Sequence, residues 1–106
     1  MNGVNEKDWK LYRSRIAAWQ EAFMGKLLKE YAKIINSDEN PSQRFWTLND
    51  KIKADKELKG VLIDSRRSLL ADNLAELLLE EAITIEDLEG FSDELIKRVK
   101  LICNIK

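Results

Sequence analysis

Apolar residues recur every three or four positions along the first third of the chain, from Trp9 to Ile34. This spacing gathers them on one face of an α-helix, whereas a half-buried strand would show strict alternation. Asn5 has a side chain suited to a helix N-cap, and Asp8 stands at the capping-box position three residues later. The pattern predicts a long helix from about Asn5 to Asn36, with these residues on its inner face: Trp9, Tyr12, Ile16, Trp19, Phe23, Leu27, Tyr31 and Ile34.

A second helix is predicted from about Pro41 to Ala54. Asn40 before Pro41 is typical of an N-cap that is followed by proline at the first helical position. Three apolar residues at steps of three and four are expected on its inner side, with Trp46 beside them: Phe45, Leu48 and Ile52.

The second half of the chain is also helical in pattern. After the glycine Gly60, leucine-rich periodicity predicts a third helix over about 61–82. A short helix is expected after the cap Thr84, and a last helix is expected after Gly90 with Ser92 as its cap. No segment shows the alternation of a strand, so the predicted fold is all-α, a four- to five-helix bundle with a long N-terminal helix, forming one domain over residues 1–106.

Self-association is predicted from the length and the apolar pattern of the first helix. At about 1.5 Å per residue it would span roughly 48 Å, but a compact domain of this size is only about 30–35 Å across. The helix must therefore bend, for which Gly25 is the expected place, or project from the bundle. Projection would expose an apolar stripe that monomers seldom tolerate, so we expect a twofold dimer. The expected interface residues are Met24, Leu28, Tyr31, Ile35, Leu62, Leu69 and Leu79.

An acidic row is the second candidate surface. Asp72, Glu76 and Glu80 stand at successive steps of four, so their carboxylates would share one helix face. We expect this row to be a solvated face or a docking face for a basic partner. It lacks the nitrogen and sulfur ligands of most transition-metal sites, and di-iron bundles require histidine; no bound metal is expected.

The composition excludes several kinds of chemistry. The chain has 106 residues, of which 35% are charged and 44% hydrophobic, with no histidine and one cysteine. A histidine-based triad and an intrachain disulfide are therefore impossible, and no phosphate-binding loop or nucleophile motif is present. The formal net charge of −1 gives no general attraction to nucleic acid. We expect neither an enzyme nor a cofactor, and interpret Cys103 as a small hydrophobic residue.

The longest stretch without a charged residue has only five residues, for instance Ile16 to Gln20, whereas a transmembrane helix needs about 20 apolar residues. The N-terminus also lacks the basic start and apolar run of a secretory signal. With its single cysteine, the chain is expected to be cytoplasmic.

The aromatic residues of the first helix offer an alternative function. We interpret them as core packing, with Trp19 as a structural core residue, because two tryptophans on one face bury a large area. Alternatively, they could line an apolar pocket and make the protein a small-ligand-binding regulator. A nucleic-acid-associated regulator is less consistent with an acidic third helix. The four residues concerned are Trp9, Tyr12, Trp19 and Phe23.

Several segments resemble a group of small all-helical bacterial proteins of uncharacterised function. The likeness lies in residues 19–24, in Asn40-Pro41-Ser42 with Phe45-Trp46, and in residues 82–95. It implies a bacterial cytosolic protein and brings no catalytic or binding residues. Members sometimes carry the label "multidrug transporter", which the short charge-free stretches of this sequence contradict. The favoured function is a non-enzymatic protein–protein interaction module that forms a homodimer or binds another protein.

Overall fold

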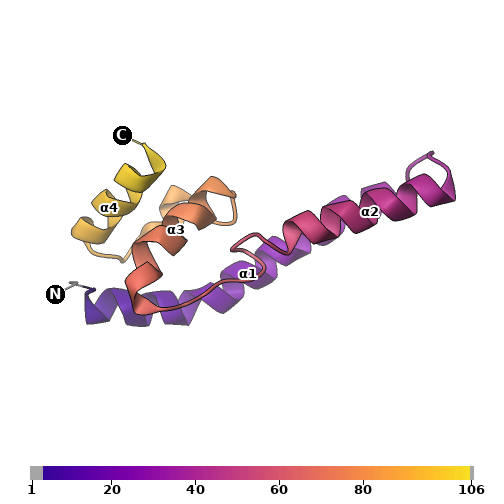
Figure 1. The fold of residues 1–106 in the computed structure, drawn as a ribbon. Helices are drawn as coiled ribbons and strands as arrows, with labels where there is room; N and C mark the ends of the chain where they lie inside the picture. The colour runs from indigo at the N-terminus through magenta and orange to yellow at the C-terminus, as the bar shows by residue number, and fades with distance from the viewer. Residues whose placement is uncertain (1–3, 106) are drawn as a thin grey trace.

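The computed structural model describes residues 4–105, and over this range it contains helices but no strand (Figure 1). The all-α prediction with a long N-terminal helix is confirmed. Met1 to Gly3 lie outside the described range. The expectation that the chain has no secretory signal depends partly on these residues. The elements in chain order are α1 (Glu6–Ile35), α2 (Pro41–Asp55), the 3-10 helix η1 (Arg67–Leu69), α3 (Leu70–Leu79), the 3-10 helix η2 (Ile85–Leu88) and α4 (Asp93–Cys103).

The molecule is elongated, with extents of 55 × 25 × 20 Å, because α1 continues well beyond the core that its first half helps to form (Figure 1). We call the first half of α1 with η1, α3, η2 and α4 the body. The second half of α1 and the antiparallel α2 form a two-helix arm that projects from it. Helix α1 passes through Gly25 without interruption, so the chain does not fold back there. Projection of the long helix, rather than a break at Gly25, resolves the mismatch in length.

One hydrophobic core holds the body together. It combines residues of α1, α3, η2 and α4, and among the described residues it includes none from α2. The buried stretch of α3 is apolar on several sides, which explains why it lies between α1 and α4. The core residues are Trp9, Tyr12, Leu70, Ala71, Leu74, Ala75, Leu77, Ile83, Leu88, Phe91 and Val99.

The predicted third helix over 61–82 is wrong at both ends. Residues 61–66 are not helical, because polar contacts hold the segment open: the Asp64 carboxylate accepts from the Arg66 backbone N–H at 3.3 Å, and the Ser65 hydroxyl lies 2.9 Å from that of Tyr12. At the other end, α3 stops at Leu79, and Glu81 adopts a left-handed conformation with φ of 62°. One long-range contact, between Ser65 and Tyr12, and local turns at both ends therefore override the helical pattern at these positions.

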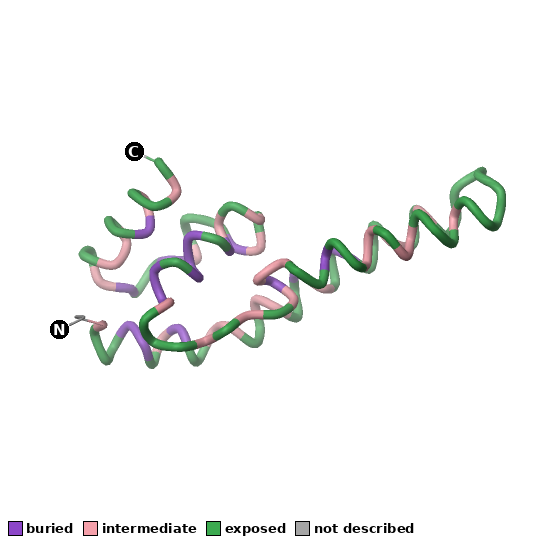
Figure 2. Tube along the Cα trace, viewed as in Figure 1, coloured by how far each residue is buried: buried purple, intermediate pink, exposed green. Residues whose placement is uncertain are grey.

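The prediction that Phe45 faces inward is also wrong, since its side chain is 64% exposed. Helix α2 packs along α1, and Leu48 and Ile52 are half-buried. Phe45 lies to one side of the contact, where its ring is mostly in solvent. Figure 2 shows the arm as mostly exposed or intermediate, whereas the buried residues concentrate in the body.

The start of α1 is fastened to the start of α4. The Asn5 side chain caps α1 as predicted, accepting from the Lys7 backbone N–H at 2.8 Å. Asp8, however, is buried and turns toward α4, where its carboxylate accepts from the backbone N–H of Ser92 at 2.8 Å and from its hydroxyl at 2.6 Å. Because Ser92 is itself the N-cap of α4, these bonds join the first turn of α1 to the first turn of α4.

Candidate functional site

The main candidate site is the apolar side of the arm, which we call the arm face. Four of its residues come from α1 and three from α2. Leu28 is 62% exposed and Ile35 50% exposed, so the stripe presents large apolar side chains to solvent as one patch. The arm face comprises Met24, Leu28, Tyr31, Ile35, Phe45, Leu48 and Ile52.

Two observations place the α1 and α2 residues on the same side of the arm. Met24, Leu28, Tyr31 and Ile35 follow one another at steps of four, three and four, so they form one stripe along α1. At the tip, Ile35 lines the same shallow hollow as Phe45 and Leu48. The two helices therefore contribute to a single apolar surface. Trp46 extends it, because its ring stands edge-on against Phe45 with the centroids 5.1 Å apart.

The contact between α1 and α2 includes a well-paired polar cluster. Tyr31 donates a hydrogen bond of 2.8 Å to the buried carboxylate of Asp55, and Lys51 bridges Asp55 at 3.1 Å and Glu30 at 2.9 Å. Burial, as the larger cause, and the hydrogen bond to Asp55 raise the pKa of Tyr31 to about 12. The hydrogen bonds to Glu30 and Asp55 raise the pKa of Lys51. These contacts hold α2 on α1, and one residue of the arm face, Tyr31, takes part in them through its hydroxyl group.

The root of the arm is anchored on the body. Phe23 is buried against Gly60, where any side chain would overlap the phenyl ring. The Glu80 carboxylate accepts hydrogen bonds from the backbone N–H groups of Lys59 at 2.8 Å and Gly60 at 3.0 Å. The arm is therefore held at a defined position, and its face is presented by a supported element rather than by a free loop.

The other predicted interface residues lie outside the arm. Leu62 follows the arm in the extended connection and Leu79 ends α3; both are strongly exposed. Leu69 is half-buried in η1, within the body. The structure thus brings four of the seven predicted residues onto one surface.

The structure separates one residue of the predicted acidic row from the other two. Asp72 and Glu76 are exposed on α3, but Glu80 lies just beyond the end of that helix. The Glu80 carboxylate is occupied by the two backbone N–H groups at the arm root. It has a structural contact that the spacing of the sequence could not indicate, because its partners are 21 and 20 residues away.

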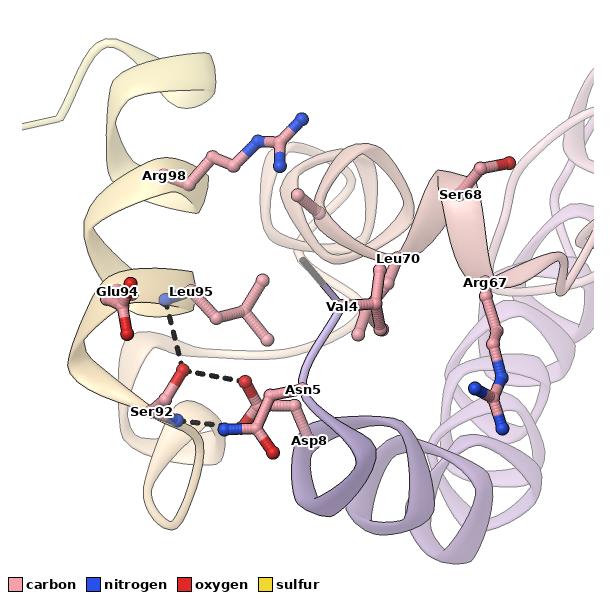
Figure 3. A pocket seen from close by; sticks show the side chains of 11 residues that line it. Val4, Asn5, Asp8, Arg67, Ser68, Leu70, Ser92, Glu94, Leu95 and Arg98 are labelled. Atoms are coloured by element: carbon pink, nitrogen blue, oxygen red, sulfur yellow. Dashed lines mark hydrogen bonds between the residues drawn. The ribbon is translucent and has the colours of Figure 1, made fainter. Parts of the chain in front are cut away.

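A hollow of about 270 Å³ lies in the body between the start of α1, η1 and α4 (Figure 3). Arg67 and Arg98 line it, which would suit an anion. However, Arg67 is paired with Glu6 at 2.9 Å, and the carboxylates of Asp8 and Glu94 line the same hollow. The positive charge is therefore balanced locally, and the volume lies below the usual range of ligand pockets, roughly 300–1,000 Å³.

Three of the four aromatic side chains of the α1 stripe are buried in the interior. Trp9, Tyr12 and Phe23 are buried, and Trp9 stacks on Tyr12 with centroids 5.6 Å apart. Trp19 is only partly buried at the edge of the core, so its expected place in the core holds only in part. These aromatic side chains leave no open pocket at Trp9, Tyr12 or Phe23.

Cys103 is half-buried. Its thiol donates a hydrogen bond to the Ala75 carbonyl at 3.3 Å, and burial raises the pKa of the thiol.

Sequence reasoning missed Phe45 and Trp46 as surface residues. A signal was available, because neighbouring residues in a helix point about 100° apart and cannot both face one partner helix.

Comparison with protein-family models, curated proteins and solved structures found no match. Within residues 4–105, no helix is long and apolar enough to cross a membrane, and no group of three or more acidic or cysteine side chains could hold a metal ion.

Proposed function

We propose that this chain is a non-enzymatic protein–protein interaction module that self-associates through the arm face. The observation that carries the proposal is the exposed apolar surface shared by α1 and α2. Leu28, Ile35 and Phe45 are each at least half exposed. A monomer would leave this surface in water, whereas a second copy offers an identical apolar surface to cover it.

The size of the arm face suits a modest interface. The 15 residues of α2 extend over about 22 Å at 1.5 Å per residue, and two adjacent helices are roughly 20 Å wide. The footprint is then about 440 Å² per copy, or roughly 900 Å² for both, which is less than the roughly 1,200 Å² of stable interfaces and is typical of weak, transient ones. We therefore expect a dimer that dissociates in the micromolar range.

Sedimentation equilibrium at micromolar concentrations tests this proposal with a matched pair of variants. Leu28→Glu places a charge on the arm face and should give a monomer. Leu101→Glu makes the same change on α4 in the body, where the side chain is 79% exposed, and should leave the dimer intact. Both positions are exposed, so neither variant should unfold the chain.

Two results would contradict the proposal. A wild-type mass of one chain at every concentration would exclude self-association. A dimer that survives Leu28→Glu but is lost in Leu101→Glu would assign the contact to the body instead of the arm.

A further inference from the structure

We infer that the outer arm, residues 28–54, opens and closes independently of the body in a single chain, and that contact between two arm faces holds it closed. This inference rests on the proposed self-association and adds a conformational change at the same surface. Three properties of the outer arm support it: its lack of buried residues, the small number of contacts between its two helices, and the position of the anchoring contacts outside it.

The outer arm contains no buried residue. Every residue from Leu28 to Ala54 is exposed or half-buried, whereas α3 has only ten residues and six of them are buried. Figure 2 shows the same contrast between the arm and the body. Local opening of a folded chain requires the least free energy where few apolar groups are buried. The outer arm meets this condition, and α3 does not.

Few specific contacts join the two helices of the arm. The polar cluster links Tyr31 to Asp55 at 2.8 Å and Lys51 to Glu30 at 2.9 Å. Toward the tip, a guanidinium group of α2 donates a hydrogen bond to the carbonyl at the end of α1. Helix α2 has 15 residues, a length at which an isolated helix is only marginally stable in water. In a single chain, α2 therefore depends on a limited contact with α1.

The contacts that anchor the arm root lie outside residues 28–54. Glu80 accepts its hydrogen bonds from Lys59 and Gly60, and the Glu81 carbonyl accepts one from Lys26 at 3.3 Å. The core of the body also contains no residue of the outer arm among the described residues. Opening of the outer arm therefore leaves both the anchoring contacts and the core intact.

Self-association stabilises the closed arm because the arm face exists only while α1 and α2 are packed together. Leu28 and Ile35 come from α1, whereas Phe45 comes from α2. An open arm has therefore lost the combined surface that a second copy covers. A partner that binds only one of two conformations shifts the population toward that conformation by mass action. Closure of the arm and dimer formation therefore increase together with protein concentration.

Hydrogen–deuterium exchange measured by mass spectrometry tests this inference. In the monomer, peptides from α2 should exchange roughly 100-fold faster than peptides from α3, after correction for intrinsic rates. The monomer is obtained as Leu28→Glu and, without any substitution, by dilution of the wild type. Above the dissociation constant, the monomer fraction falls with the square root of the protein concentration. A concentration increase of about 100-fold should therefore slow exchange in α2 by about tenfold. The control Leu101→Glu, which leaves the arm face unchanged, should behave as the wild type.

The outcomes separate this inference from the proposed function. Equal protection of α2 and α3 in the monomer would overturn the inference, even if sedimentation equilibrium showed a wild-type dimer and so supported the proposed function. Exchange in α2 that does not change with concentration, in a chain that sedimentation shows to dimerise, would also overturn it. A wild type that is monomeric at every concentration would remove the proposed function together with the coupling.

Discussion

Replacing Asp8 with alanine would remove a buried carboxylate from the start of α4. The Asp8 side chain is 4% exposed and belongs to α1, yet both of its hydrogen bonds go to Ser92, 84 residues later. Ser92 in turn accepts from the Leu95 backbone N–H and caps α4. Without Asp8, the N–H of Ser92 would lose its only protein partner in the described structure.

The expected loss of stability follows from these two bonds. A hydrogen bond to a charged group contributes about 1.5–3 kcal/mol, and an unsatisfied buried donor costs about 1–3 kcal/mol. The variant no longer has to bury a charge, which offsets part of the loss. We therefore expect Asp8→Ala to lower the free energy of unfolding by about 2–4 kcal/mol, a large share of the total for a small domain.

Urea titration followed by circular dichroism at 222 nm measures this loss. Asp93→Ala is the matched control, because it removes an exposed carboxylate from the first turn of the same helix. That change alters only the interaction with the helix dipole, which is about 0.3–1 kcal/mol. An Asp8→Ala variant no less stable than Asp93→Ala would refute the role assigned to the Asp8–Ser92 contact.

Three further outcomes are expected from stability measurements. Gly60→Ala should destabilise the chain, because the new methyl group overlaps Phe23. Gly25→Ala should stabilise the chain by about 0.5–1 kcal/mol, because the surroundings of Gly25 are open. Equal effects of the two substitutions on stability would contradict both assignments. The pKa of Tyr31, about 12 in the folded state against roughly 10 unfolded, means that its contribution is complete below pH 10 and is lost as the pH rises toward 12. Tyr31→Phe should therefore lose less stability than wild type over that range in urea titrations; an equal loss would count against the contact. Trp19→Ala should cost about 1.5–2.5 kcal/mol by thermal or urea unfolding, less than the roughly 3–5 kcal/mol of a fully buried tryptophan; a full-sized loss would place Trp19 in the core.

The hydrophobic pattern alone determined the helical class and the long first helix. Periodicity and caps are local properties, so Asn5, Asn40 and Ser92 mark helix starts in both the sequence and the structure. The stripe Met24, Leu28, Tyr31 and Ile35 could be recognised for the same reason.

Only the tertiary structure decided which apolar faces are covered. Phe45 has the spacing of an inner residue, but α2 packs mainly on α1 and this side chain lies to one side of that contact, in solvent. The sequence predicts Asp8 as a capping-box residue and Glu80 as part of an exposed acidic row, but each accepts two hydrogen bonds from groups distant in the sequence. Periodicity records which side of a helix is apolar, whereas burial depends on which segments meet in space, and that is a property of the folded chain as a whole.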